Sequence, residues 1–455
     1  MPRPDSGRPD SGRPGHGRPE QGRPGHGSAA TVTRRTALAL GGSGLIAAAL
    51  AACARGTDTR PSAPGTVTLN SDNPTWGPGY AAASAVLVRR TGYRIMSRSI
   101  ASVANYTQII RMTAQTDSTT DLIKWTNGYR LQDIARADIL TDLGDVWDDA
   151  IERKWVDPAQ RASFSYKGKP YGVPLYKSYY AVFYSKKAFA EHGIAVPTTF
   201  DEMLAAADTL KTAGITPFLS PGATTWEAEI WFMQLLASID PEYYTAVTTD
   251  HASYLDAPAK QAMDLWSSMY AKGYFSAPDV TSNDLPGLVG KGRFGMMLYG
   301  TWFANTLLAA GLTDEDIGFF HVPPQTASVR PAIVVESGSL SVPVKAHRHV
   351  AAVDVARNWL ATDVQTAWVG FLGDTSPNPA ALPKSNLVKV LAADIAATKP
   401  MELTRYWEAS PTPLIEGNVA DLGAFMVNPS PANGLSTLRS MQSRADTEWK
   451  VWDAA

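Results

Sequence analysis

Few residues of this chain have the types and spacing that covalent or metal chemistry requires. The sequence contains no H-E-x-x-H zinc motif, no G-x-S-x-G nucleophile motif and no P-loop. His347 and His349 lie two positions apart, but the basic residues around them favour a solvated loop over a metal site. Glu227, Glu336 and Asp374 could supply the two carboxylates of a glycoside hydrolase, which we keep as an alternative. We expect no catalytic residue, no metal and no cofactor.

Cys53 is the single cysteine of the sequence, so it can form neither an internal disulfide nor a cysteine-based zinc site. Residues 50–53 read Leu-Ala-Ala-Cys, which resembles the bacterial lipobox. The resemblance implies that Cys53 is acylated and anchors the mature chain in a membrane, because buried acyl chains bind lipid strongly. The alternative is a plain secreted protein with an incidental cysteine.

The residues before Cys53 have the pattern of an export signal. Thr33-Arg34-Arg35-Thr36 precedes an apolar run over 37–52, which is shorter than the roughly 20 residues of a spanning helix. Twin arginines favour the Tat route over Sec, although Ala37 stands where Phe or Leu is usual. We expect a signal peptide with lipobox over 32–53, a small and polar tether over 54–64, and an extracytoplasmic, membrane-anchored location.

Residues 1–31 differ from the rest of the chain. Residues 6–27 repeat Gly-Arg-Pro with a period near five and hold no large apolar residue, so nothing offsets the entropy of ordering them. We expect a disordered Gly/Arg/Pro-rich extension. Translation could instead begin at Val32 through an alternative start codon, and N-terminal peptide mapping of the precursor would distinguish the two.

Length and charge bound the class of protein. At 455 residues, two or three domains are expected. The net charge is −2, and the first 52 residues hold seven Arg and three acids, so the remainder carries −6. A mildly acidic body gives no electrostatic reason to expect a nucleic-acid partner.

From residue 65 onward, short apolar strands alternate with amphipathic helices, which is typical of an α/β layer with a largely parallel sheet. Thr199 and Glu202 form a capping box before one of the helices. The expected strands are 66–69, 94–97, 122–125, 179–184, 294–299 and 317–320, and the expected helices are 80–90, 106–114, 185–192, 201–213, 227–238, 259–272, 302–310, 350–360, 364–370 and 435–452.

Five blocks, in order, resemble the extracellular solute-binding proteins of ABC importers, family 1, the sugar-binding type. The third block departs from the family pattern with Phe200 for the usual Trp, and the second with Ser185 for the usual Asn. The blocks are 168–174 (Gly-Lys-Pro-Tyr-Gly-Val-Pro), 182–189 (Val-Phe-Tyr-Ser-Lys-Lys-Ala-Phe), 193–202 (Gly-Ile-Ala-Val-Pro-Thr-Thr-Phe-Asp-Glu), 294–302 (Phe-Gly-Met-Met to Gly-Thr-Trp) and 351–368.

The resemblance implies a two-lobe, periplasmic-binding-protein-like α/β fold with a hinge and a ligand cleft between the lobes. It places the N-lobe at 65–180 plus 334–385 and the C-lobe at 181–333 plus 386–455. It also implies a monomer, not an enzyme, that captures a mono- or oligosaccharide and delivers it to the permease subunits of an ABC importer. A non-sugar solute and a structural surface lipoprotein remain alternatives.

The expected site follows from the chemistry of a sugar ring. Aromatic rings can cover its apolar faces, while planar polar side chains pair with its hydroxyls. Clefts of α/β sheets lie at the carboxyl ends of strands. Together with the family resemblance, this gives the candidates Asn73, Trp76, Trp125, Tyr129, Tyr176, Ser178, Trp226, Glu227, Trp302, Glu336 and Asp374.

Overall fold

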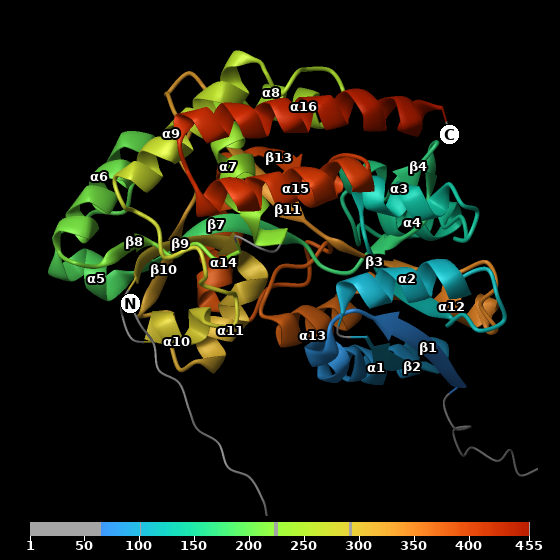
Figure 1. Cartoon of the computed structure of the whole chain (residues 1–455). Coiled ribbons are helices and arrows are strands. Elements are labelled where there is room, and N and C mark those ends of the chain that lie inside the picture. The colour runs from blue at the N-terminus through green and yellow to red at the C-terminus, as the bar shows by residue number, and fades with distance from the viewer. Residues whose placement is uncertain (1–64, 101, 223–225, 291–293, 455) are drawn as a thin grey trace, which may run out of the picture. The chain divides into compact units, whose positions relative to one another are not determined.

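The structure is a computed structural model that describes residues 65–100, 102–222, 226–290 and 294–454 (Figure 1). These residues all belong to one compact unit, Ser62–Ala455. The expected extension over 1–31, the signal peptide over 32–53 with Cys53, and the tether over 54–64 lie outside the described residues. They therefore stay predictions.

The first of two large sheets has five strands, in the order β2-β1-β3-β12-β6. β1 pairs in parallel with β2 and β3, whereas β12 runs antiparallel to β3 and β6. We call this sheet, with the helices packed on it, the N-lobe. Its strands are β1 (Gly65–Ser71), β2 (Tyr93–Ser99), β3 (Leu122–Thr126), β6 (Val173–Pro174) and β12 (Gly338–Ser341).

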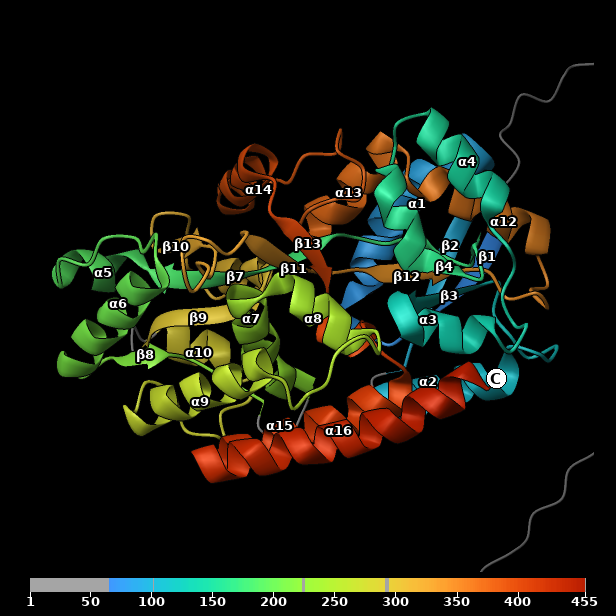
Figure 2. The same ribbon diagram turned by 90° about the horizontal axis from the view of Figure 1, so that it is seen from above.

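Helices from two distant parts of the chain share the N-lobe core, as the blue and orange ribbons show (Figure 2). They include α1, which packs on α12 and α13 from a much later part of the chain. The helices are α1 (Gly77–Thr91), α2 (Val103–Thr113), α3 (Gly128–Ala135), α4 (Gly144–Glu152), α12 (His349–Trp359) and α13 (Thr362–Leu372), with the short 3₁₀ helices η1 (Pro74–Trp76) and η2 (Pro158–Phe164) and the hairpin β4 (Ser165–Tyr166) and β5 (Lys169–Pro170).

The second sheet has six strands, in the order β13-β11-β7-β9-β8, with β10 also on β7. Its central strand is buried along seven of its eight residues, which explains its continuous apolar and aromatic sequence. This sheet and its helices form the C-lobe. Its strands are β7 (Ser178–Ser185), β8 (Thr216–Phe218), β9 (Phe294–Gly300), β10 (Ile317–Phe320), β11 (Ala332–Glu336) and β13 (Met401–Thr404).

The C-lobe carries most of the described helices. In α6 the expected capping box is confirmed, because the Thr199 hydroxyl accepts from the Glu202 amide (3.2 Å) and the Glu202 carboxylate accepts from the Thr199 amide (3.1 Å). The helices are α5 (Lys186–Glu191), α6 (Phe200–Thr212), α7 (Glu229–Ile239), α8 (Pro241–Thr248), α9 (Ala257–Ala271), α10 (Leu285–Gly290), α11 (Ala304–Ala309), α14 (Asn386–Thr398), α15 (Thr412–Val427) and α16 (Pro431–Asp453), with the 3₁₀ helices η3 (Trp226–Ala228), η4 (Thr301–Phe303) and η5 (Tyr406–Glu408).

The expectation of a largely parallel sheet is confirmed for β1, β2 and β3, but it does not hold for the second sheet. β7 runs antiparallel to β9, β10 and β11, and only the β11–β13 and β8–β9 pairs of this sheet are parallel. Strand and helix alternation along the chain suggested parallel strands. It does not account for strands that enter a sheet after crossing from the other lobe, and these can run in either direction.

The two-lobe α/β fold is confirmed by two separate apolar cores. One holds side chains from 67–176 and 340–372, and the other holds side chains from 180–334 and 387–449. The chain leaves the first sheet after Pro174, returns at Ser337 between β11 and β12, and leaves again between α13 and α14. The exact lobe ranges expected from the sequence stay a prediction. None of the helices in the described part of the chain is both long and apolar enough to cross a bilayer.

Candidate functional site

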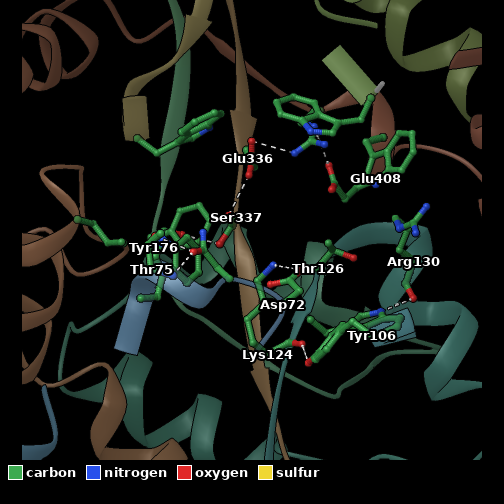
Figure 3. Close-up of a pocket in the computed structure, with 18 of the residues that line it drawn as sticks. Asp72, Thr75, Tyr106, Lys124, Thr126, Arg130, Tyr176, Glu336, Ser337 and Glu408 are labelled. Carbon is green, nitrogen blue, oxygen red and sulfur yellow. Dashed lines mark hydrogen bonds and ion pairs between the residues drawn. The ribbon is translucent and has the colours of Figure 1, made fainter. Parts of the chain in front are cut away.

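A cavity of about 570 Å³ has walls from both lobes and from the segment that joins them (Figure 3). Figure 3 shows Glu336 and Glu408 on one side, and Asp72, Lys124 and Tyr106 on the other. The lining residues are Asp72, Asn73, Thr75, Trp76, Tyr106, Thr107, Lys124, Trp125, Thr126, Arg130, Tyr176, Trp226, Trp302, Asn305, Thr306, Glu336, Ser337, Phe371, Leu372, Arg405, Trp407 and Glu408.

The turn after β1 brings Trp76 to the wall. The Asn73 side chain accepts hydrogen bonds from the backbone amide (3.0 Å) and hydroxyl (2.7 Å) of Thr75, and so begins η1. The Trp76 ring then meets Tyr176 edge-on, with ring centroids 5.6 Å apart. Asn73 thus sets the conformation of the turn, and Trp76 presents its indole.

Trp125 closes the N-lobe end of the cavity at the end of β3. Its indole lies 5.9 Å from the Tyr106 ring, and its Nε1 donates to the carbonyl oxygen of Arg130 at 2.9 Å. Only 5% of Trp125 is exposed, so its ring contributes an edge to the cavity and packs mainly against the core.

The C-lobe supplies a second pair of indoles, from η3 and η4. The rings of Trp226 and Trp302 lie 6.1 Å apart, and Tyr299 supports Trp302 at 4.8 Å. The guanidinium of Arg405 covers Trp226, 4.7 Å from its ring centroid. Among the described residues, no guanidinium covers the ring of Trp302, and its indole packs against other aromatic rings.

Glu336 stands at the return crossing between the lobes. Its carboxylate accepts from the hydroxyls of Tyr176 (2.9 Å) and Tyr180 (3.0 Å) and pairs with Arg405 (2.9 Å). Burial acts to raise the pKa of Glu336, but the Arg405 guanidinium and the two tyrosine hydroxyls outweigh it and hold that pKa below its usual value. Glu336 is therefore an ionised, structural member of the cavity wall.

Arg405 is the centre of a buried cluster with three glutamates. Besides Glu336, its Nε donates to Glu229 at 2.8 Å and lies 3.7 Å from a carboxylate oxygen of Glu408. Burial raises the pKa of Glu229 to about 8 and that of Glu408 to about 7, since one cation cannot compensate three carboxylates in a low dielectric. The cluster consequently holds protons near neutral pH.

Two further ion pairs border the cavity on the N-lobe side. Lys124 donates to Asp72 at 2.8 Å and lies over the Trp76 ring. Arg130 reaches from α3 across to the C-lobe, where it pairs with Glu416 in α15 (3.2 Å) and covers the Trp407 ring (4.7 Å). Arg130 thus makes a direct contact between the lobes beside the cavity.

Several buried polar atoms of the lining residues have no hydrogen-bond partner among the residues that the structure describes. They are Asp72 Oδ1, Thr126 Oγ1, Trp302 Nε1 and both carboxylate oxygens of Glu408. Buried polar groups are normally satisfied, because desolvation without a partner costs about 1–3 kcal/mol each. These atoms are suited to bind a polar guest, and acceptors outnumber donors among them.

Seven of the eleven candidates named from the sequence line this one cavity: Asn73, Trp76, Trp125, Tyr176, Trp226, Trp302 and Glu336. Their contact with a ligand stays a prediction. Sequence reasoning missed Asp72, Lys124, Arg130, Arg405 and Glu408, and left Trp407 unassigned. No motif marks them. The position of Asp72 directly after β1, beside Asn73, was a usable signal.

The other four candidates lie outside the cavity lining. Tyr129 packs against Trp449 and Trp452 of α16, with ring centroids 5.3 and 5.2 Å away. Glu227 is buried beside Tyr299, whose hydroxyl donates to it at 3.2 Å. Ser178 donates to Asp374, so both belong to the crossing segments.

The Asp374 carboxylate connects three segments. It also accepts from the Thr301 hydroxyl (2.6 Å) and the Thr375 amide (2.8 Å), and burial raises its pKa to about 7. This pKa lies above the unfolded value near 4, so between these pH values the native state holds a proton that the unfolded state has released. The stability that this proton contributes is lost as the pH rises from about 4 to 7.

Asp374→Asn is therefore expected to remove a pH-dependent loss of stability. Relative to the parent, the free energy of unfolding of this variant should gain about 1.4 kcal/mol per pH unit between pH 4 and 7. Urea unfolding at pH 5 and pH 8 measures the difference. Asp363→Asn, on the exposed partner of Arg90, is the matched control. Equal pH slopes in parent and Asp374→Asn would contradict the assignment.

No cluster of three or more His, Cys, Asp or Glu side chains with the geometry of a metal site occurs among the described residues.

The family model for bacterial extracellular solute-binding proteins matches residues 91–366, more than half of the chain. The chain belongs to this family. Among solved structures, a bacterial solute receptor, AcbH, superposes with a TM-score of 0.72 at 20% identity, covering 84% of this chain and 99% of that one. A chitin oligosaccharide binding protein gives 0.72 at 17% identity, with 85% and 100% coverage.

Curated relatives of this solute-binding protein align with a smaller part of the chain than these solved structures do. An uncharacterized ABC transporter extracellular-binding protein of Pyrococcus horikoshii is 26% identical over 51% of this chain and 52% of its own length. The diacetylchitobiose binding protein of Streptomyces coelicolor is 24% identical over 57% and 59%. The alpha-glucosides-binding periplasmic protein of Rhizobium meliloti is 26% identical over 53% and 56%. The chain thus spans little more than half the length of these relatives.

Proposed function

We propose that this solute-binding protein captures a carbohydrate outside the cytoplasm and passes it to the permease of an ABC importer. The observation that carries the proposal is a single cavity with indoles from both lobes and unsatisfied polar atoms between them. A sugar ring has apolar faces suited to Trp302, Trp226 and Trp76, and a rim of hydroxyls that could satisfy the unpaired oxygens of Asp72 and Glu408.

Named relatives support a sugar as the ligand class. One binds alpha-glucosides and another diacetylchitobiose, while the receptor AcbH is described as preferring β-D-galactopyranose. These ligands differ in linkage and substituents but share pyranose rings. The proposal for this chain therefore extends to pyranosides as a class and leaves the individual sugar open.

The wall composition also gives a mechanism of capture. Trp76 and Trp125 belong to the N-lobe, whereas Trp226, Trp302 and Glu408 belong to the C-lobe. A ligand touches both sets only when the lobes approach, so its binding free energy favours the closed state. Glu336 and Ser337 lie on the segment that crosses between the lobes, so this segment forms part of the cavity wall.

The proposal includes attachment to the membrane through an acylated Cys53 after export, with a monomeric chain and no cofactor. We also propose that the N-lobe comprises 65–180 plus 334–385 and that the C-lobe comprises 181–333 plus 386–455. Metabolic labelling with a fatty-acid analogue, compared between the parent and Cys53→Ser, tests the anchor. Labelling that persists in the variant would contradict it.

Hydrolysis of the bound sugar finds less support than capture. Glu227 and Asp374 are not among the cavity-lining residues, and Glu336 is held by two tyrosines and Arg405. A glycoside hydrolase would need two of these carboxylates facing the scissile bond. A non-sugar solute stays open as a second candidate, favoured by the ionised groups at the cavity edge.

A ligand screen tests the function directly. We expect D-galactose, maltose or N,N′-diacetylchitobiose to raise the melting temperature, because a ligand that binds only the native state stabilises it. Isothermal titration calorimetry then gives the affinity of each positive sugar. An extended panel of mono- and oligosaccharides without any binding would refute carbohydrate capture, and binding of amino acids or polyamines instead would support the second candidate.

A further inference from the structure

Glu408 has an unusual environment for a buried carboxylate. It is 1% exposed, and neither carboxylate oxygen has a hydrogen-bond partner within the described residues. Its nearest cation is Nε of Arg405 at 3.7 Å, which is too long for a hydrogen bond. That nitrogen already donates to Glu229 at 2.8 Å, and Nη1 of the same guanidinium forms an ion pair with Glu336 at 2.9 Å. Among the described residues, Glu408 is thus left without a hydrogen-bond donor.

The backbone holds Glu408 firmly on the cavity wall. Gly128, at the start of α3, has φ = +57°, and a Cβ at this position would lie 2.2 Å from the Glu408 carbonyl oxygen. Glycine therefore permits η5 to pack directly against the N-lobe helix. Beside it, Arg130 covers the neighbouring Trp407. The unsatisfied carboxylate is consequently a fixed feature of the site.

We propose that Glu408 is the principal polar anchor of the cleft, and that its two oxygens accept hydrogen bonds from neighbouring hydroxyls of a sugar ring. The inference rests on the proposed function and names a residue that determines ligand specificity within it. An ionised carboxylate only accepts, so its partner must bring two donors, and adjacent ring hydroxyls do so in one plane. The ligand class is then a pyranoside with a free vicinal diol.

Asp72 supplies a matching acceptor from the opposite lobe. Its Oδ2 takes the hydrogen bond from Lys124, while Oδ1 has no partner among the described residues. A sugar bonded to Glu408 in the C-lobe and to Asp72 in the N-lobe would bridge the lobes by polar contacts. The excess of acceptors over donors in the wall agrees with a ligand that presents mainly hydroxyl hydrogens.

The charges that face Glu408 make its protonation sensitive to the ligand. They are Arg405 beside it, Glu336 of β11, Arg130 of α3 and Lys124 of β3, with Glu229 of α7 sharing Arg405. Burial raises the pKa of Glu408 to about 7 in the empty site. Hydroxyl donors favour the ionised form and lower that pKa, so binding near pH 6.5 releases a proton and affinity falls as the pH drops below 7.

Calorimetric titration of the full chain tests the proposal, with whichever of D-galactose, maltose and N,N′-diacetylchitobiose binds most tightly. We expect Glu408→Gln to bind it about 10- to 100-fold more weakly at pH 8, as for the loss of hydrogen bonds to a charged group. In the parent, Kd should rise up to tenfold per pH unit below 7, with proton release visible as a buffer-dependent binding enthalpy. Glu408→Gln should lose both effects. Glu402→Gln, on the exposed partner of Lys177, is the matched control.

The outcomes distinguish a failure of the Glu408 anchor from a failure of carbohydrate capture. Parent-like affinity and pH dependence in a folded Glu408→Gln would overturn the anchor while leaving carbohydrate capture intact. If no sugar binds the parent, both fail. If Glu408→Gln does not fold, Glu408→Asp keeps the charge, and it should retain proton release at reduced affinity. Loss of proton release in Glu408→Asp, or a sugar lacking a vicinal diol bound as tightly as its parent compound, would also overturn the anchor.

Discussion

Arg405→Met is expected to lower the free energy of unfolding by about 3–5 kcal/mol at neutral pH, the cost of leaving buried carboxylates without their cation. The methionine keeps most of the side-chain volume, so cavity formation contributes little. Glu336 is affected most, because Arg405 and two tyrosines hold it in the ionised form. Chemical denaturation at pH 7 measures the change.

The pH dependence of that loss distinguishes electrostatics from packing. Without Arg405, the pKa of Glu336 is no longer held down and those of Glu229 and Glu408 rise further, so the variant loses stability as the pH increases from about 5 to 8. The loss in the free energy of unfolding caused by Arg405→Met should therefore be smaller at pH 5 than at pH 7. It should also be smaller when Glu336→Gln is introduced together with Arg405→Met. Arg90→Met is the control, because its pair with Asp363 has side chains 33% and 49% exposed and contributes about 0–1 kcal/mol. A deficit independent of pH would contradict the account.

The second large effect concerns Trp302. Trp302→Ala is expected to weaken sugar binding by about 1–3 kcal/mol, or roughly 5- to 150-fold, through lost apolar contact. Trp302 lines the cavity beside Trp226, and in the described part of the chain only the Trp226 ring of this pair lies under a guanidinium. Calorimetry with the tightest sugar of the screen measures the loss.

Two further variants make the Trp302 result specific. Trp302→Phe keeps an aromatic face and should recover part of the affinity. Trp155→Ala removes an indole that lies against Arg90 and Arg153, outside the cavity lining, and should leave the affinity unchanged. Unchanged binding by Trp302→Ala, with a folded protein, would remove Trp302 from the site.

The cavity wall and the crossing between the lobes share residues. Glu336 lies at the end of β11, Ser337 forms the crossing, and Arg130 joins α3 to α15 beside the cavity. A change in the charge of the cluster around Arg405 therefore acts on the cavity wall as well as on the contact between the lobes.

The sequence by itself determined most of the local structure and the fold class. Apolar periodicity placed α1, α6, α9, α12 and α16, because each has a buried face that the 3.6-residue repeat reveals. Capping chemistry located the start of α6. Helices with little periodicity, such as α15, and the short strands β12 and β13 were not predicted, because their burial depends on partners far along the chain.

The tertiary structure alone decided the polar half of the site. Seven aromatic or loop residues could be named in advance because ring size and turn position are local properties. Asp72, Arg130, Arg405 and Glu408 meet only because the chain crosses between the lobes three times, bringing residues more than 300 positions apart to one cavity. Likewise, the pKa of Glu408 depends on burial and on the competition of three carboxylates for one guanidinium, which is a property of the packed cluster and of no single segment.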